Sequence, residues 1–226
     1  MAKTEAPKAE VTRKKILIVD DHAVLREGLV AQLNREPGLI VCGEAETARA
    51  AIEAVEKLHP DLVLADITLP GRNGLELIRD LHALRPALPV LVLSMHDASL
   101  FAERVLRAGG RGYISKQQSG QRLIHAIRHV LSGQIYLSDE ESTRLFGSLT
   151  GQRRGKTLSP VEQLTDRELE VFTLVGQAKE TKVISRRLGM SAKTVEAHRA
   201  SIKRKLKLKT GPELTRHAVL WVEAVR

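Results

Sequence analysis

The fold of this chain is decided by Ile16-Leu17-Ile18-Val19-Asp20-Asp21, in which four apolar residues lead directly into two carboxylates. Three later runs share this design: 62–65 before Asp66, 90–93 before Ser94, and 113–115 before Lys116. Short unbroken apolar runs that alternate with helical patterns are typical of buried parallel strands. We therefore expect these runs to be strands of one sheet, each followed by a polar side chain.

Strand and helix patterns alternate five times over the first part of the 226 residues. Strands are expected near 15–20, 39–45, 61–66, 89–94 and 111–115. Helices are expected near 22–35, 47–58, 74–84, 98–108 and 120–132. Repeated strand–helix units predict an α/β fold, a doubly wound five-stranded parallel sheet with right-handed crossovers and helices on both faces.

The polar residues at these strand ends should meet in space. In open α/β sheets, reactive groups gather beyond the carboxyl ends of the strands. Packed carboxylates repel one another and stay ionised when a hard divalent cation lies among them. Asp20 and Asp21 therefore suit Mg²⁺, with a backbone carbonyl near Thr68 as a further ligand.

Asp66 ends the central run, where its carboxylate can attack a phosphoryl group and form an acyl phosphate. Lys116 would pair with one phosphoryl oxygen, and the Ser94 hydroxyl would donate to another. Taken singly, each residue has an ordinary explanation as a turn, capping or solvated residue. Their shared position at strand ends favours one common site.

Residues from about 14 to 133 resemble the receiver domain of two-component response regulators. The resemblance rests on the motifs at 20–22 (DDH), 66–74 (DITLPGRNG) and 112–116 (GYISK), together with Ser94. It implies a flavodoxin-like fold in which Asp66 accepts phosphate from a sensor histidine kinase. Many relatives have a proline directly after the lysine, where this chain has Gln117.

The same resemblance implies roles for the surrounding residues. Mg²⁺ would be held mainly by Asp21, Asp66 and the Thr68 carbonyl. Ser94 and Tyr113 would couple phosphorylation to a change of surface. A phosphoryl group adds roughly −1.5 to −2 charges at one point, which can bias a bistable neighbouring surface.

Excess positive charge is confined to the last third of the chain. Residues 1–150 carry 19 Lys and Arg against 19 Asp and Glu, whereas residues 151–226 carry 17 against 8. The net charge of +9 therefore belongs to the second segment alone. It indicates a polyanion partner for that segment. A solvated, Lys-rich helical surface is the alternative.

From Leu164 onward the pattern is wholly helical. The expected helices are 166–176 capped by Thr165, 181–188 ended by Gly189, 192–206 capped by Ser191, and a last helix from Gly211-Pro212 to about 225. A helix, a short glycine-containing turn and a capped helix form a helix-turn-helix pattern. A small helical domain that docks another protein is the alternative.

These changes of pattern divide the chain into four segments: a disordered tail over 1–13, a receiver domain over 14–133, a linker over 134–159, and a small all-α, four-helix helix-turn-helix domain over 160–226. A short helix is expected after Ser138, because Ser138 to Glu141 has capping-box spacing. The stretch 147–160, with its three glycines, is expected to be exposed.

The helix expected over 192–206 is the candidate recognition helix. Val195, Ile202 and Leu206 share one face and should pack inward. The candidate DNA-binding residues lie on the other faces and on the preceding helix: Lys182, Lys193, Thr194, Glu196, Ala197, His198, Ala200, Ser201, Lys203 and Arg204. Small central side chains allow close entry into the major groove, and the flanking cations reach phosphates.

Residues 160–226 resemble the LuxR-type DNA-binding domain through the motifs at 164–171 (LTDRELEV), 184–188 (ISRRL) and 191–198 (SAKTVEAH). Joined to a receiver, this makes the chain similar to NarL/FixJ-type transcription regulators. It departs from the pattern at Asp166, where proline is common, at Glu180, where serine or threonine usually caps, and at Val183, where a polar residue is frequent.

Base contacts in the family tend to come from positions matching Glu196, Ala197 and Ala200. Glu196 could accept from a cytosine amine or pair with Lys193. Since none of the three residues is basic, the preferred DNA sequence cannot be carried over.

The last helix places Leu214, Ala218 and Trp221 on one stripe. Such a stripe usually packs in the core, and the resemblance implies that part of this helix forms a dimer on DNA. Core packing is favoured for Leu214, and both roles stay open for Trp221. A two-fold dimer, expected after phosphorylation, would read two half-sites.

The sequence thus predicts a phosphorylation-controlled regulator that binds double-stranded DNA. No apolar stretch approaches the ~20 residues of a membrane span. The first 13 residues lack the apolar segment of a secretory signal, and Cys42 is the only cysteine. These features fit a cytoplasmic protein without a membrane partner.

Three alternatives stay open. A phosphatase with an aspartyl-phosphate intermediate would need a carboxylic acid two residues after the nucleophile, and position 68 is threonine. The same domains could also serve a regulator that works without phosphorylation, or a module that binds protein through its helical part.

Overall fold

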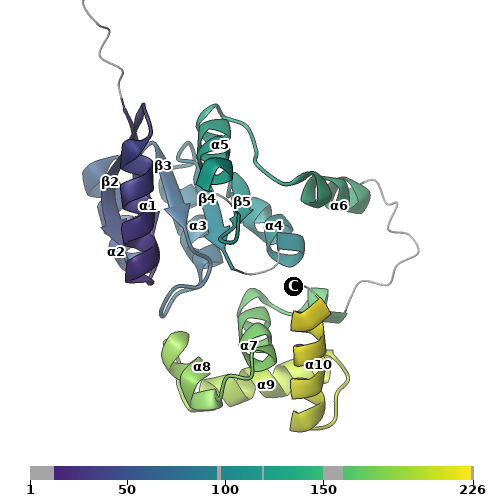
Figure 1. Ribbon diagram of the computed structural model, residues 1–226. Coiled ribbons are helices and arrows are strands. Elements are labelled where there is room, and N and C mark those ends of the chain that lie inside the picture. The colour runs from purple at the N-terminus through teal and green to yellow at the C-terminus, as the bar shows by residue number, and fades with distance from the viewer. Residues whose placement is uncertain (1–12, 96–97, 119, 150–159, 225–226) are drawn as a thin grey trace, which may run out of the picture.

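The computed structural model describes residues 13–95, 98–118, 120–149 and 160–224. It contains an α/β part, from β1 to α5, and a helical part, from η1 to α10 (Figure 1). The strands are β1 Lys14–Val19, β2 Leu39–Ala45, β3 Leu62–Ala65, β4 Val90–Ser94 and β5 Gly112–Ser115. All pair in parallel in the order β2-β1-β3-β4-β5. The predicted doubly wound fold class is confirmed.

Each helix that was predicted with bounds begins and ends within one residue of them, whereas the short 3-10 helix η1 was not predicted. In the α/β part they are α1 Ala23–Arg35, α2 Ala48–Leu58, α3 Gly74–Leu84, α4 Ala98–Arg107 and α5 Gly120–Leu131. In the helical part they are η1 Pro160–Gln163, α7 Asp166–Gly176, α8 Thr181–Arg187, α9 Ala192–Lys205 and α10 Gly211–Ala224.

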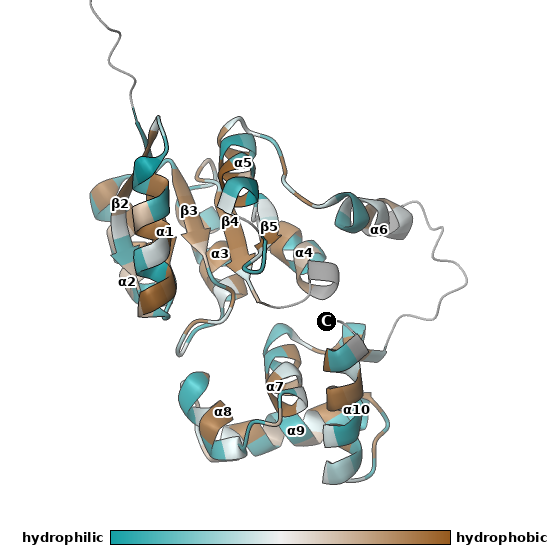
Figure 2. Cartoon of the chain, viewed as in Figure 1, coloured by the Kyte–Doolittle hydropathy of each residue, from teal (hydrophilic) through white to brown (hydrophobic). Residues whose placement is uncertain are grey.

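The two faces of the sheet pack against different helices. Since side chains alternate along a strand, Leu17 and Val19 join the apolar cluster that contains residues of α2, α3 and α4. Ile16 and Ile18 join the cluster that contains residues of α1 and α5. Figure 2 shows the consequence, with brown strands between helices that alternate brown and teal.

The cluster on the α4 side continues into the helical part, where it includes Val161, Phe172 and Ile202. The two parts of the chain therefore meet through apolar as well as polar contacts. The helical part has the predicted caps. Thr165 forms a capping box with Glu168 at the start of α7, and the Ser191 hydroxyl accepts from the Thr194 amide at the start of α9.

The segment after α5 differs from the prediction in two ways. Its backbone extends the sheet edge, because the Tyr113 amide donates to the Tyr136 carbonyl at 3.1 Å and the Tyr136 amide donates to the Arg111 carbonyl at 3.0 Å. Helix α6 then runs over Asp139–Leu149, beyond the short helix expected after Ser138 and into the stretch expected to be exposed linker. Residues 150–159 of that stretch, and 1–12 of the expected tail, lie outside the described residues.

None of the described helices combines the length and the apolar character that a membrane crossing requires.

Candidate functional site

An acidic pocket forms where the strands end, as predicted. Asp20 follows β1, Asp66 follows β3 and Lys116 follows β5. The Lys116 Nζ lies 2.6 Å from Asp20 Oδ2 and 2.7 Å from Asp66 Oδ2. All three side chains are at most 5% exposed, so these charges are stabilised by one another rather than by water.

Backbone geometry fixes Asp66 at the start of a tight loop. The Thr68 amide donates to Asp66 Oδ1 at 3.2 Å, and the Gly74 amide donates to the Ile67 carbonyl at 2.8 Å. A Cβ at Gly74 would lie 2.6 Å from the Asp66 carbonyl oxygen, so only glycine lets α3 begin so close to the acid. The buried Asn73 side chain caps α3 by accepting from the Leu75 amide at 2.6 Å.

Burial raises the pKa of the Asp66 carboxyl above its ordinary value, and the nearby charge of Asp20 acts in the same direction. The Lys116 ammonium and the Thr68 amide oppose this rise. The pocket therefore holds Asp66 as a poorly solvated carboxylate with a single cationic neighbour. Adding a strongly anionic group to this carboxylate is therefore favourable only if cations compensate for the added negative charge.

The donor set of the pocket fits a hard divalent cation. Asp20, Asp21, His22 and Asp66 each offer a ligand atom, and these atoms all lie within 4.8 Å of one another. Asp21 Oδ1 is buried and accepts no hydrogen bond from the described residues, although His22 Nδ1 lies 2.9 Å away. A buried carboxylate oxygen without a donor is suited to bind a cation.

Ser94 and Tyr113 are both buried, at the end of β4 and within β5. Ser94 pairs with Ser115 across the two strands, and its carbonyl accepts from the Lys116 amide at 2.9 Å. The backbone that carries the serine is thus bonded to the backbone that carries the lysine. The sheet brings Asp20, Asp66 and Lys116 into direct contact and places Ser94 on the adjoining strand end.

Sequence reasoning missed Arg26, a buried arginine on the inner side of α1. Its Nη1 donates to the Asp20 carbonyl at 2.6 Å, so it supports the backbone of the acidic pocket from behind. Its Nε and Nη2 donate to Glu44 at 2.9 Å and to Glu46 at 2.7 Å. The available signal was a charged residue in register with Leu29 and Leu33 on the face that packs inward.

A second candidate site lies on α9, whose inward face is formed by Val195, Ile202 and Leu206 as predicted. The opposite face is open to solvent. Its exposed residues, with Lys182 of α8, are Lys193, Thr194, Glu196, Ala197, Ala200 and Arg204. His198, Ser201 and Lys203 are partly buried at its edges.

Two of the candidate DNA-binding side chains are bonded to another helix. Glu196 accepts from the Thr181 hydroxyl at 2.8 Å and lies 3.7 Å from Arg199, so its described ion-pair partner is Arg199 rather than Lys193. The Ser201 hydroxyl donates to Glu168 of α7 at 2.7 Å. Ser201 therefore positions α9 on α7, and Glu196 is linked to α8.

Glu168 connects the cap of α7 to the end of α9. It accepts from Ser201, from Lys205 Nζ at 2.6 Å and from the Thr165 amide at 2.7 Å. Burial acts to raise its pKa, but these three donors prevail and lower the pKa of Glu168 to about 2.

Replacing Glu168 with glutamine is expected to destabilise the helical part by about 3 kcal/mol at pH 7, because the buried Glu168 carboxylate is lost and the partly buried Lys205 ammonium loses its counter-charge. Wild-type stability from this group is present above pH ~4.5 and is lost as the pH falls toward about 2. Urea unfolding followed by the fluorescence of Trp221, the one tryptophan, measures both effects. Glu180→Gln, at an exposed position without a side-chain capping bond, is the control. Equal stability of the two variants would contradict the assignment.

Two of the three predicted dimerisation residues are in the core rather than on the surface. Leu214 and Ala218 are fully buried, because α10 packs closely on α7 at Gly176. Trp221 is half-buried, with its ring centroid 5.4 Å from that of Phe172. Core packing, which the sequence favoured for Leu214, is observed for both residues, and the alternative of a dimer face is corrected for Leu214 and Ala218 because a dimer contact requires accessible side chains. Leu220, 55% exposed, is the large apolar residue that α10 presents outward.

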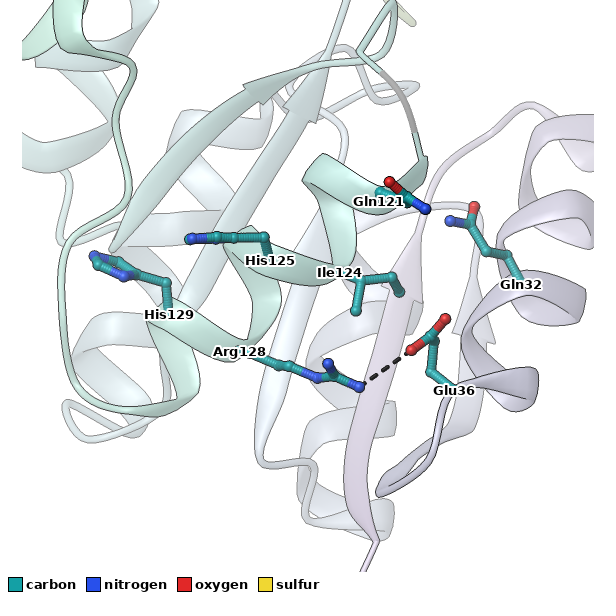
Figure 3. A pocket seen from close by; sticks show the side chains of 7 residues that line it. All are labelled: Gln32, Glu36, Gln121, Ile124, His125, Arg128 and His129. Carbon is teal, nitrogen blue, oxygen red and sulfur yellow. Dashed lines mark hydrogen bonds and ion pairs between the residues drawn. The ribbon is translucent and has the colours of Figure 1, made fainter.

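A separate pocket of about 520 Å³ lies between α1 and α5 (Figure 3). Gln32 of α1 and Glu36, directly after α1, line one side, and Gln121, Ile124, His125, Arg128 and His129 line it from α5. Arg128 Nη2 lies 3.1 Å from Glu36 Oε2 across it. It contains no residue of the acidic pocket.

Comparison with known proteins adds an independent line of evidence. A profile described as response regulator receiver domain matches residues 16–128, half of the chain. One described as bacterial regulatory proteins, luxR family, matches residues 162–218. The oxygen regulatory protein NreC of Staphylococcus carnosus is 37% identical over 212 residues, 91% of this chain and 96% of that protein.

Two solved structures are similar in fold, the first over part of the chain and the second over most of it. A LuxR-family two-component response regulator from Aurantimonas sp. SI85-9A1 is 33% identical, with a TM-score of 0.57 over 61% of this chain and 99% of that one. The RcsB response regulator of Salmonella typhimurium has a TM-score of 0.67 over 92% of this chain and 98% of that one. At 23% identity, the second likeness concerns the fold alone.

Proposed function

Because the chain belongs to the two-component response regulators that join a receiver domain to a LuxR-type DNA-binding domain, we propose that a sensor histidine kinase phosphorylates it on Asp66. Phosphorylation then controls its binding to double-stranded DNA and hence transcription. The observation that carries this proposal is the buried Asp66 carboxylate, which pairs with Lys116 and is bridged by it to Asp20 at one edge of the sheet.

The chemistry follows from the residues of the pocket. An Asp66 oxygen attacks the phosphorus of a phosphohistidine; a P–O bond forms, and the P–N electron pair returns to the imidazole. Lys116 then exchanges its contact with the Asp66 carboxylate for one with a phosphoryl oxygen, and the Ser94 hydroxyl donates to another. Mg²⁺, held by Asp20, Asp21, Asp66 and the Thr68 carbonyl, would neutralise charge on the transferring group.

We assign the receiver domain to residues 14–133, the linker to 134–159 and the DNA-binding domain to 160–226. Tyr113 serves with Ser94 as a switch residue. Since position 68 is threonine, the acid that a turnover phosphatase would need there is missing, and the acyl phosphate serves as a signal. The protein acts in the cytoplasm, where its DNA lies.

DNA is bound by the exposed face of α9. Lys193, Lys203 and Arg204 contact phosphates, and the small Ala197 and Ala200 let the helix approach base edges. Phosphorylation favours a homodimer with two half-sites. Because Leu214 and Ala218 are buried, the exposed side of α10 around Leu220 is the surface that α10 can offer to a partner subunit.

A gel-shift titration with and without acetyl phosphate and Mg²⁺ tests the function. The full chain is incubated with DNA fragments from its genome, and the fragment with the tightest binding is titrated in both states. Phosphorylation is expected to lower the Kd for that fragment. A Kd that the donor leaves unchanged would instead favour regulation without phosphorylation.

The affinity for DNA is expected to fall steeply with salt, because cations on α9 replace counterions at phosphates. For a dimer that makes roughly six phosphate contacts, the association constant should drop about 10³-fold between 50 and 200 mM salt. Fluorescence anisotropy of a labelled duplex measures this slope. Binding that is indifferent to salt would contradict phosphate contacts and favour a domain that docks protein.

A further inference from the structure

One carboxylate at the start of α7 binds two arginines of the α/β part. Asp166 Oδ2 accepts from Arg79 of α3 at 2.7 Å, and its Oδ1 accepts from Arg104 of α4 at 2.7 Å. Arg104 also donates to the Leu164 carbonyl at 2.8 Å. The side chains of Asp166 and Arg104 are 22% and 18% exposed. Because the pair is shielded from solvent, it should stabilise the contact more than an exposed surface salt bridge would.

A second contact ties the loop after Asp66 to the turn of the helix-turn-helix. Arg167 Nη2 donates to the Gly71 carbonyl of that loop and to the Leu188 carbonyl of the turn, both at 2.7 Å. Its Nη1 donates to Glu170 at 2.8 Å. A Cβ on Gly189 would lie 2.7 Å from the Gly71 Cα, so the two backbones are in direct contact.

Glu170 is buried at this contact, with its side chain 2% exposed. Burial raises its pKa to about 7, although the charge and hydrogen bond of Arg167 act against the rise. Glu76, on α3 of the α/β part, and Asp166 add repulsion in the same direction as burial. A carboxylate of the helical part is therefore influenced by a charge from the α/β part across the contact.

The contact leaves the DNA-facing side of α9 free. Lys193, Ala197, Ala200 and Arg204 are all exposed, whereas the partners of the α/β part are the first turn of α7 and the turn before α9. The two parts are therefore connected without contacts that cover α9, the proposed recognition helix. What the contact fixes is the orientation of the helix-turn-helix relative to the acidic pocket.

We propose that Asp166 and Arg167, with Arg79, Arg104 and the Gly71 carbonyl, form an interdomain latch that couples phosphorylation of Asp66 to DNA binding, an inference that rests on the proposed function. The latch sits on the two segments of the α/β part that leave the pocket. Gly71 lies on the loop whose Thr68 amide holds Asp66, and α4 follows the strand that ends in Ser94. A new phosphoryl charge displaces these segments and so breaks or reshapes the latch.

Linkage makes the coupling reciprocal: if phosphorylation changes the latch, the state of the latch changes the response to phosphorylation. Asp166 stands where proline is common in LuxR-type domains, and proline could accept neither arginine through its side chain. This part of the latch therefore belongs to this chain rather than to the general LuxR-type pattern.

Three variants of the full chain test the latch. Asp166→Asn removes the charge that both arginines share, and Arg104→Gln removes the α4 partner. Gly189→Asn places a side chain against the Gly71 backbone while keeping a residue that tolerates the positive φ of 59°. Arg107→Gln is the control, because Arg107 is an exposed arginine on the same helix that pairs with Glu103 of its own turn.

The readouts are the ratio of DNA Kd without and with acetyl phosphate, and the radius of gyration from small-angle X-ray scattering without donor. Each latch variant is expected to bring the Kd ratio at least fivefold closer to one and to raise the radius of gyration, whereas Arg107→Gln matches wild type. Uptake of phosphate from the donor by every variant confirms that the α/β part is folded.

Latch variants that keep the wild-type ratio and radius, in a wild type that does respond to donor, would overturn the latch and leave the proposed function standing. A wild type that takes up phosphate without any change in Kd would overturn the proposed function, and the latch with it.

Discussion

Replacing Asp66 with asparagine is expected to abolish phosphoryl uptake. The amide of asparagine is a poor nucleophile, and no other described carboxylate combines burial with a position between Lys116 and the Thr68 amide. The fold should persist, because Lys116 keeps its 2.6 Å ion pair with Asp20. Incubation with radiolabelled acetyl phosphate and Mg²⁺, followed by gel autoradiography, should show labelled wild type and a variant at background.

Asp61→Asn is the matched control for this experiment. Asp61 precedes the same strand β3 and pairs with Lys14 at 3.0 Å, at the end of the sheet opposite to the acidic pocket. It loses the same charge by the same change of chemistry, and its labelling should equal that of wild type. Equal labelling of the Asp66 variant would refute Asp66 as the acceptor.

The second large effect is expected from Ala197→Glu on the exposed face of α9. Glutamate is a good helix former, so α9 should remain intact. In the groove the new carboxylate faces phosphates and base edges, where juxtaposed like charges cost several kcal/mol. A loss of about 3 kcal/mol corresponds to roughly a 100-fold weaker Kd for the duplex, measured by anisotropy with the phosphorylated protein.

Ala31→Glu makes the same substitution at an exposed position of α1, far from α9 in the sequence and in the α/β part. It changes the net charge of the protein by the same amount and so controls for a general electrostatic effect. Its Kd should stay within about twofold of wild type, as expected for a distant charge screened by salt. If both variants bind DNA like wild type, α9 is not the recognition helix.

Local pattern was sufficient for the elements and for the pocket. Unbroken apolar runs such as 62–65 can be buried only when both faces of a sheet are covered, so they predicted parallel strands. Parallel strands place their carboxyl ends on one edge, so Asp20, Asp66 and Lys116 had to meet there. The caps Thr165 and Ser191 could be predicted for a similar reason, because a capping bond joins residues that are three positions apart.

Arg26 illustrates what the sequence left open within the pocket. Its three partners lie on β2, on the loop after it and at the Asp20 carbonyl. The local pattern does not predict which acidic side chains a buried arginine will contact. For the same reason the stripe on α10 could not be divided into core and surface until α7 was seen to cover Leu214 and Ala218.

The sequence by itself determined the two folds, the acidic edge of the sheet and the basic helix, because each depends on periodicity or on contacts between near neighbours. Only the tertiary structure decided how the two parts meet. Asp166 accepts hydrogen bonds from Arg79 and Arg104, and Arg167 donates to the Gly71 carbonyl. These bonds join residues between 62 and 96 positions apart in the sequence. Such contacts depend on how two complete surfaces fit together, and no periodicity in the sequence predicts that fit.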